Sequence, residues 1–346
     1  MEDYNYQGNT AAVNVPYPDE TALQKQNELQ ERRMVRKTSS GVGFFVLVYY
    51  LVMMTSSVVL TLVVRGMRIA TADNENMLNS FLQMAYMTMA PLIAAFFYRV
   101  ISRKRLSDAF SKSHVPFKRL VPMVLLGMMV AMLANQLATM FDSNISLFHL
   151  YNNVPDMDKA NTSLDMILSF VVTAIVPAFA EEFAFRGIVM GSLRKHGDAF
   201  AIIGSAVLFG AMHGNTTQII FAFTLGLIFG YIDCKANSIV PSIIIHFANN
   251  FYAILHDILS SALKDDAAVM LIYTLIIGAF YLLGLLSFVY LARAEKGFFK
   301  MTNEDNTTLT ISLKDKIAAY LTNAGVIISL SLFLIETLGF LSTSAT

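Results

Sequence analysis

Long runs without a charged residue are the feature that most constrains how this chain can fold. A helix of about 20 apolar residues spans the hydrocarbon core of a bilayer, and four uncharged runs reach that length. Only 14% of the residues are charged, whereas soluble domains average about 25%. The sequence therefore predicts an all-α, polytopic helical membrane bundle. The four runs are 41–64, 77–98, 120–141 and 267–292.

Basic residues beside these runs predict how the chain is oriented. Loops on the cytoplasmic side carry an excess of Lys and Arg. The polar segment 1–38 ends in four basic residues, and 99–119 is the most basic stretch of the chain. We therefore expect an integral protein of a bacterial cytoplasmic membrane, with its N-terminus in the cytoplasm. The further helices that we expect are 163–193, 199–213, 218–232, 239–255 and 317–340, which makes nine.

The same patterns divide the chain into a tail and a membrane domain. We expect 1–38 to be a solvated cytoplasmic tail, with a short helix over Thr21–Lys37, and 39–345 to be the membrane domain. Asp233 is expected on the cytoplasmic side, after the helix 218–232. The net charge is zero, so nothing indicates a nucleic-acid partner, and the lipid bilayer is the first partner that the sequence predicts.

The stretch Glu181–Gly187 brings charges directly after the uncharged run 166–180. Charged side chains at membrane depth are costly and usually face a bundle interior or a wet cavity. Glu182 and Arg186 are four residues apart, which favours an ion pair on one helix face. Glu181 points about 100° away from Glu182 around the helix. One carboxylate thus has a partner in its own helix, and Glu181 is left to point elsewhere.

Further polar residues lie in or beside the later apolar helices. His213 follows one such helix, and His246 lies inside another. Asn250 shares a helix face with His246, and Phe209 is placed to pack beside the ring of His213. Together with Glu181, the two imidazoles and the amide can activate water and hold an oxyanion. The other histidines, expected at the surface, are His114, His149, His196 and His256.

These residues leave other interpretations open. Glu181, His213 and His246 are also able to bind a divalent metal such as Zn²⁺, with water as the fourth ligand. Alternatively, the polar groups only hydrogen-bond one another and join the helices. A transporter with a polar proton path is a third interpretation, although no inverted repeat or pair of broken helices is seen.

Three motifs occur in order on successive helices: Glu-Glu-x-x-x-Arg at 181–186, Phe-x-x-x-His at 209–213 and His-x-x-x-Asn at 246–250. With them the chain resembles, over about 120–260, the CPBP family of intramembrane proteases. That family comprises CAAX prenyl proteases and the Abi, or bacteriocin-processing, proteins. The fold expected with this resemblance is a bundle of about eight to nine transmembrane helices with a conical polar cavity.

The resemblance also implies a role for each motif residue. Glu181 would activate the attacking water with help from His213, while His246 and Asn250 would hold the oxyanion. The supporting residues would be Glu182, Arg186 and Phe209.

The function expected from these roles is an intramembrane endopeptidase acting on a membrane-bound peptide or a lipidated protein. Members of the family are described both as metalloproteases and as glutamate proteases, so the cofactor stays open. The alternative is a non-catalytic membrane scaffold or immunity protein of the same family.

Overall fold

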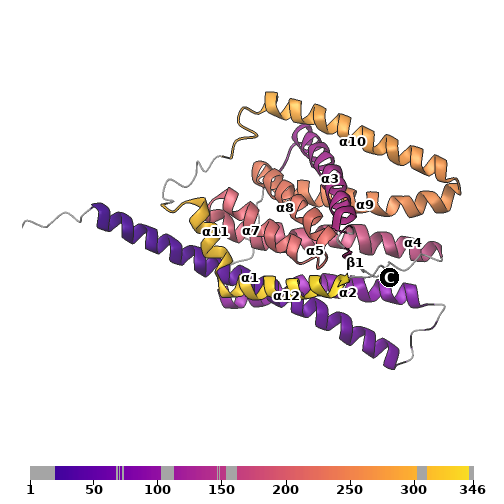
Figure 1. Ribbon diagram of the computed structural model, residues 1–346, viewed down its shortest axis with the longest axis horizontal. Coiled ribbons are helices and arrows are strands. Elements are labelled where there is room, and N and C mark those ends of the chain that lie inside the picture. The colour runs from indigo at the N-terminus through magenta and orange to yellow at the C-terminus, as the bar shows by residue number, and fades with distance from the viewer. Residues whose placement is uncertain are drawn as a thin grey trace, which may run out of the picture.

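The computed structural model describes residues 20–67, 69, 71, 74–102, 113–145, 147, 149–152, 162–301 and 310–342. These residues are almost entirely helical, and Figure 1 shows the long helices lying side by side as a bundle. The helices are α1 (Glu20–Gly66), α2 (Glu75–Ser102), α3 (Phe117–Ile145), α4 (Ser163–Phe170), η3 (Val171–Ile175), α5 (Val176–Glu182), η4 (Phe183–Met190), α6 (Gly191–Leu193), η5 (Arg194–His196), α7 (Asp198–Ala211), α8 (Thr216–Ala236), α9 (Val240–Leu263), α10 (Asp266–Ala294), α11 (Leu313–Leu321) and α12 (Ala324–Phe340). Two short strands, β1 (Tyr151–Asn152) and β2 (Leu341–Ser342), pair antiparallel.

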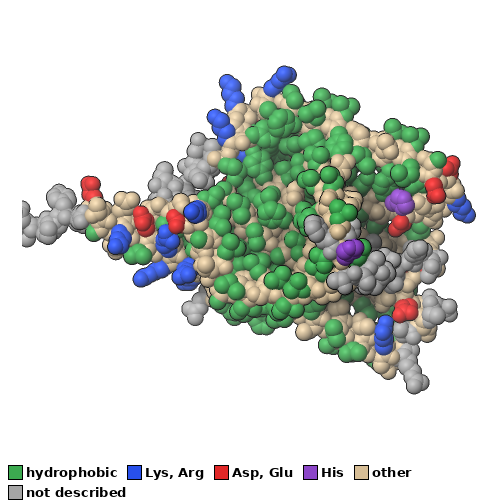
Figure 2. Space-filling view, in the orientation of Figure 1, with side chains coloured by type: hydrophobic (Ala, Val, Ile, Leu, Met, Phe, Trp, Pro, Cys, Tyr) green, Lys and Arg blue, Asp and Glu red, His purple; other side chains and the backbone are tan. Residues whose placement is uncertain are grey.

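The helical membrane bundle expected from the sequence is confirmed. Six helical stretches of the described chain are long and apolar enough to cross a membrane, or seven if α11 and α12 count as one bent span. The face seen in Figure 2 is mostly hydrophobic, and its charged side chains gather toward the ends of the molecule. An apolar belt between charged ends is the surface that a bilayer requires.

The count by length and apolarity is lower than the eight to nine spans expected, and two helices account for the difference. α7 is apolar but has only 14 residues, about 21 Å at 1.5 Å per residue. α9 has 24 residues but is not among the apolar spans, because its sequence includes His246, Asn250 and Asp257. Both helices carry residues of the polar motifs, Phe209 in α7 and His246 and Asn250 in α9.

The stretch Ser163–His196 is one continuous run of 34 helical residues. This confirms the expectation that the helix continues past Gly187. Two parts of it, η3 and η4, are π-helical, a geometry that is rare and often occurs at functional sites. Glu181 consequently lies near the middle of the stretch.

The expected helix 317–340 is divided in two, with a bend of 66° between α11 and α12. Asn323 ends the continuity, because its side chain caps α12 by accepting a hydrogen bond from Gly325 N at 3.0 Å. Gly43 of α1 lies against this point, where a Cβ on Gly43 would come within 2.5 Å of the Gly325 backbone. The close crossing with α1 therefore positions α12 separately from α11.

The segment 1–38 was expected to be solvated, and this is wrong only from Glu31 onward, because residues 20–30 are exposed apart from the half-buried Glu28. Residues 1–19 lie outside the described chain, and α1 then runs without a break through residue 39. Glu31 and Val35 are buried. Glu31 forms an ion pair with Lys316 of α11, with Oε1 and Nζ 3.1 Å apart. This part of the tail is thus packed against the bundle, although it is helical as expected.

The buried apolar side chains form two clusters, and the polar motifs lie between them. Phe209 of α7 and Phe185 of η4 belong to the first cluster, which also includes residues of α1, α2 and α12. Phe229 of α8 belongs to the second, with residues of α3 and α9. α7 and α8 approach closely at Gly226, where a Cβ would come within 2.9 Å of the Ala206 Cα. The close contact between α7 and α8 thus brings the two clusters together next to Phe209 of the second motif.

We predict that Gly226→Val destabilises the protein by about 1–3 kcal/mol, the usual cost of overpacking a close contact. The matched control is Gly278→Val in α10, because a Cβ on Gly278 would meet nothing within 4 Å. Thermal unfolding of the purified protein in detergent measures both variants. An equal loss of stability in the two variants would contradict the close contact.

Candidate active site

Glu182 is the centre of the polar motifs and is completely buried. Its Oε2 lies 3.0 Å from Arg186 Nε, one turn further along the same helix. Its Oε1 accepts a hydrogen bond from His246 Nδ1 of α9 at 2.8 Å. The side chains of Glu182 and Arg186 are both 0% exposed. The ion pair expected from the four-residue spacing is therefore present, and it also reaches the histidine of the last motif.

Aromatic rings surround the buried guanidinium of Arg186. Its Cζ lies 4.2 Å from the ring centroid of Phe209 and 5.1 Å from that of Phe229. A cation over an aromatic face is stabilised by the ring quadrupole, more strongly where water is excluded. Arg186 therefore contacts one ring from each apolar cluster.

The contact with Glu182 defines the tautomer of His246. A carboxylate paired with Arg186 is ionised and accepts hydrogen bonds only. His246 Nδ1 must therefore carry the proton of the 2.8 Å contact. The other ring nitrogen, Nε2, then points toward Glu181, whose Oε2 lies 4.0 Å away. The two adjacent glutamates thus face opposite nitrogens of one imidazole.

Glu181 has no counterion in its own helix, as expected. It is 9% exposed, and its Oε2 is buried without a hydrogen-bond partner among the described residues. Its distance of 4.0 Å from His246 Nε2 is too long for a direct hydrogen bond. A buried carboxylate oxygen without a partner is costly, so this atom is suited to binding a polar group of a ligand or a water.

His213 lies in the turn that follows α7, not within a helix. Its Nδ1 is 2.8 Å from the carbonyl oxygen of Phe209. That oxygen is available because His213 N bonds to the Gly210 carbonyl instead. A carbonyl only accepts, so Nδ1 carries the proton and Nε2 is an acceptor when the ring is neutral. The rings of Phe209 and His213 pack edge to face at 4.9 Å, as expected.

The amide of Asn250 is fixed by a backbone carbonyl that proline leaves free. Pro177 has no N–H and cannot bond to the carbonyl four residues earlier, that of Thr173. Asn250 Nδ2 donates to this oxygen at 2.9 Å. Asn249 Nδ2 in turn donates to Asn250 Oδ1 at 3.2 Å. The orientation of the Asn250 amide is therefore set from two sides, with one more Nδ2–H able to donate.

Asp233, which was expected on the cytoplasmic side, is buried inside the protein, with 1% of its surface exposed. Its Oδ1 accepts a hydrogen bond from Ser242 N at 3.1 Å. The N-cap residue of α9, Ile239, has no side-chain acceptor, whereas the first N–H groups of a helix need one. Asp233 supplies it and so positions the helix that carries His246. The signal in the sequence for this contact was the apolar residue Ile239 at the N-cap of α9, because a helix that starts without a polar cap needs an acceptor from elsewhere in the chain.

The three-residue metal site of Glu181, His213 and His246 is not assembled. No group of three His, Cys, Asp or Glu side chains in the described chain is arranged to hold a metal ion. Glu181 and His246 approach each other, but a catalytic zinc site uses three protein ligands. The Nδ1 atoms of both histidines bind the Phe209 carbonyl and Glu182, so only their Nε2 atoms could face a metal. The donors therefore do not fit a zinc site.

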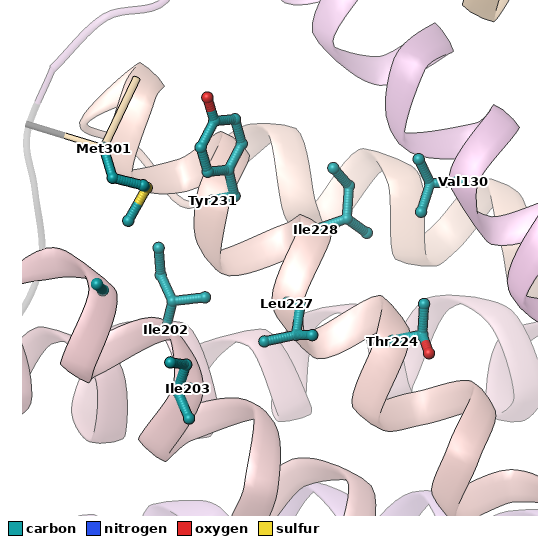
Figure 3. A pocket seen from close by; sticks show the side chains of 9 residues that line it. Val130, Ile202, Ile203, Thr224, Leu227, Ile228, Tyr231 and Met301 are labelled. Carbon is teal, nitrogen blue, oxygen red and sulfur yellow. The ribbon is translucent and has the colours of Figure 1, made fainter. Parts of the chain in front are cut away.

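A cavity of about 410 Å³ lies near α7 and α8, but it is apolar and separate from the polar motif residues. Figure 3 shows apolar side chains of α3, α7 and α8 around it, including Val130, Ile202 and Leu227. Thr224 and Tyr231 bring the only side-chain oxygens among the described residues that line it. Such an apolar hollow on a membrane bundle suits lipid chains and contains no motif residue.

A comparison with known proteins supports the family resemblance that the three motifs indicated. Residues 163–252 match a family described as "Type II CAAX prenyl endopeptidase Rce1-like". The match covers about a quarter of the chain, from α4 into α9, and includes all three motifs. The resemblance to the CPBP and CAAX protease family is thereby confirmed for these residues, a shorter range than 120–260. Neither a curated protein nor a solved structure matches the chain.

We predict that Arg186→Met destabilises the protein by about 3–5 kcal/mol, because it leaves the buried carboxylate of Glu182 without its counterion. The matched control is Arg194→Met. Arg194 also pairs with an acid one turn away, Asp198, but both side chains are partly exposed. Its loss should cost less than about 1 kcal/mol. Chemical unfolding in detergent measures both, and equal costs would contradict a special role for the buried pair.

Proposed function

We propose that this protein is an intramembrane endopeptidase in which Glu181 activates a water molecule. The observation that carries the proposal is the pairing of Glu181 and His246. Glu181 Oε2 is buried and has no hydrogen-bond partner among the described residues, and it faces His246 Nε2 at 4.0 Å. A water bound to both atoms would be held beside a base, which is the arrangement that general-base catalysis needs.

In the proposed reaction, Glu181 removes a proton from this water while its oxygen attacks the peptide carbonyl carbon. The tetrahedral intermediate carries a negative carbonyl oxygen. In the proposal, Asn250 donates its second Nδ2–H to this oxyanion. His246 Nε2, which accepts from the water beforehand, would need to take up a proton from water before it could donate as well. The C–N bond then breaks, and the leaving amine receives the proton that Glu181 took up.

His213 has a supporting role in the proposal. Its Nδ1 is engaged by the Phe209 carbonyl, so its Nε2 is the nitrogen able to orient the water or relay its proton. Glu182 keeps His246 in the required tautomer, and Arg186 balances the charge of Glu182. The proposed steps are written without a metal, because no three His, Cys, Asp or Glu side chains of the described residues are arranged to hold one.

The proposed substrate is a membrane-bound peptide or a lipidated protein. The matching family is described as a CAAX prenyl endopeptidase, and a bundle of apolar helices would meet membrane-bound peptides and lipidated proteins in the bilayer. Precursors of peptide pheromones and bacteriocins belong to the same class of membrane-bound peptide substrates. The proposal includes a bacterial cytoplasmic membrane and an N-terminus in the cytoplasm, which the basic flanks of the helices favour.

We predict that Glu181→Gln lowers cleavage by about 10²–10⁴-fold, the usual contribution of a general base. The matched control is Glu75→Gln, the same chemical change at an exposed position of α2. Peptides extracted from membranes of cells with each variant, at equal expression, are compared by mass spectrometry. A product that appears with the wild type and Glu75→Gln, and is missing with Glu181→Gln, identifies the substrate.

Unchanged cleavage in Glu181→Gln would contradict the proposal. If the peptide profiles are identical and the cellular phenotype persists, the protein acts instead as a non-catalytic scaffold or immunity protein. The amount of inserted protein must be equal in the membranes for either conclusion.

A further inference from the structure

The apolar helix α12 carries a single charged residue, Glu336. It lies about 18 Å from the start of the helix at 1.5 Å per residue, and its side chain is half-buried. Charged groups at membrane depth are costly and usually mark a functional position. The family match ends at residue 252, so neither the motifs nor the match accounts for this carboxylate.

Two other acids that are shielded from water have counterions inside the protein. Glu182 pairs with Arg186. Glu31 pairs with Lys316, whose Nζ also donates to the His196 carbonyl at 3.0 Å. His196 is itself buried, so its expected surface position is wrong. At both places the protein supplies the positive charge that a shielded carboxylate requires.

The hydrogen-bond partner of Glu336 is Tyr50 of α1, which is neutral. Tyr50 Oη donates to Oε2 at 3.0 Å, and the Tyr50 ring packs edge to face on Phe333, with 5.0 Å between the centroids. Glu336 forms no ion pair and no second hydrogen bond with the described residues. A hydroxyl does not replace a counterion, and the carboxylate has further lone pairs that accept. Glu336 is therefore suited to binding a positively charged group.

Glu336 lies beside the turn that carries His213. Gly214 directly follows His213, and a Cβ on Gly214 would come within 2.8 Å of Glu336 Cδ. At the same level of α1, Tyr49 packs against Phe185 in the helix of the first motif, with ring centroids 6.2 Å apart. His213 and Glu336 are both half-buried. The carboxylate therefore borders the candidate active site, although it comes from a distant part of the chain.

We propose that Glu336 binds the positively charged side chain of a Lys or Arg residue of the substrate, close to the bond that is cleaved. The inference rests on the proposed function, because the contact beside His213 is what brings the carboxylate near the substrate. A hydrogen bond between two ionised groups is stronger than one between neutral groups. A link between α1 and α12 alone would need only an acceptor for Tyr50, which a neutral side chain also provides. The charge of Glu336 is what favours a basic substrate.

The experiment uses the purified full-length protein in a neutral detergent. The probes are short palmitoylated peptides with one Lys, placed at successive positions, and the same peptides with Gln in place of Lys. Native mass spectrometry measures the dissociation constant of each peptide. The wild type should bind at least one Lys peptide about tenfold more tightly than its Gln counterpart, because a hydrogen bond to a charged group supplies a difference of this size.

The variant that tests the site is Glu336→Gln, which should lose the tenfold preference. Its amide keeps the shape of the side chain and an acceptor for Tyr50 but removes the charge. The matched control is Glu75→Gln, the same change at an exposed position of α2, which should keep the preference. Glu181→Gln should also keep it, because the proposal assigns the basic side chain to Glu336 and the water to Glu181.

Three results would overturn this assignment. The first is equal binding of every Lys peptide and its Gln counterpart by the wild type, a comparison that does not depend on whether a variant folds. The second is a preference that persists in Glu336→Gln. The third is an equal loss of preference in Glu75→Gln. Binding is measured separately from cleavage, so unchanged cleavage in Glu181→Gln would contradict the proposed peptidase without altering the preference measured here.

Discussion

The position of Glu182 between Arg186 and His246 is the interaction on which the rest of the site depends. A buried carboxylate is tolerated only with a counterion and hydrogen bonds, and here both come from side chains that would otherwise be unpaired. The contact joins the helix of the first motif to α9. Through the rings over Arg186 it also reaches α7 and α8. One buried charge pair thus holds all three motifs in register.

Helix geometry explains why two neighbouring glutamates have different environments. Residues one apart point about 100° away from each other, so only Glu182 reaches Arg186. Glu181 approaches the same imidazole from its other nitrogen and has no partner at Oε2 among the described residues. Glu182 therefore provides the contacts that join the helices, and Glu181 keeps the oxygen to which the proposed function assigns the water. The hydrogen bond from Ser242 N to Asp233 positions α9, the helix that carries His246.

Contacts within one helix were predictable from the sequence, and contacts between distant segments were not. The Glu182–Arg186 pair follows from a four-residue spacing, which helical geometry sets by itself. Phe209 and His213 have the same spacing and pack together, although His213 lies in the turn after α7. The bend before α12 depends on Gly43 meeting Gly325, two residues far apart in the chain. The burial of Asp233 and His196 likewise comes from segments that pack over them. The bond between Asn250 and Thr173 required both the position of Pro177 and the docking of α9.

The tautomer of His246 tests the central claim of this account most directly. Nitrogen NMR of the histidine-labelled protein in detergent at neutral pH distinguishes which ring nitrogen carries a proton. The His246 signals are identified by their loss in His246→Gln. If Glu182 orients the ring toward Glu181, Nδ1 is protonated. A His246 ring protonated only at Nε2 would contradict the account, because neither the contact with Glu182 nor the acceptor facing Glu181 would then exist.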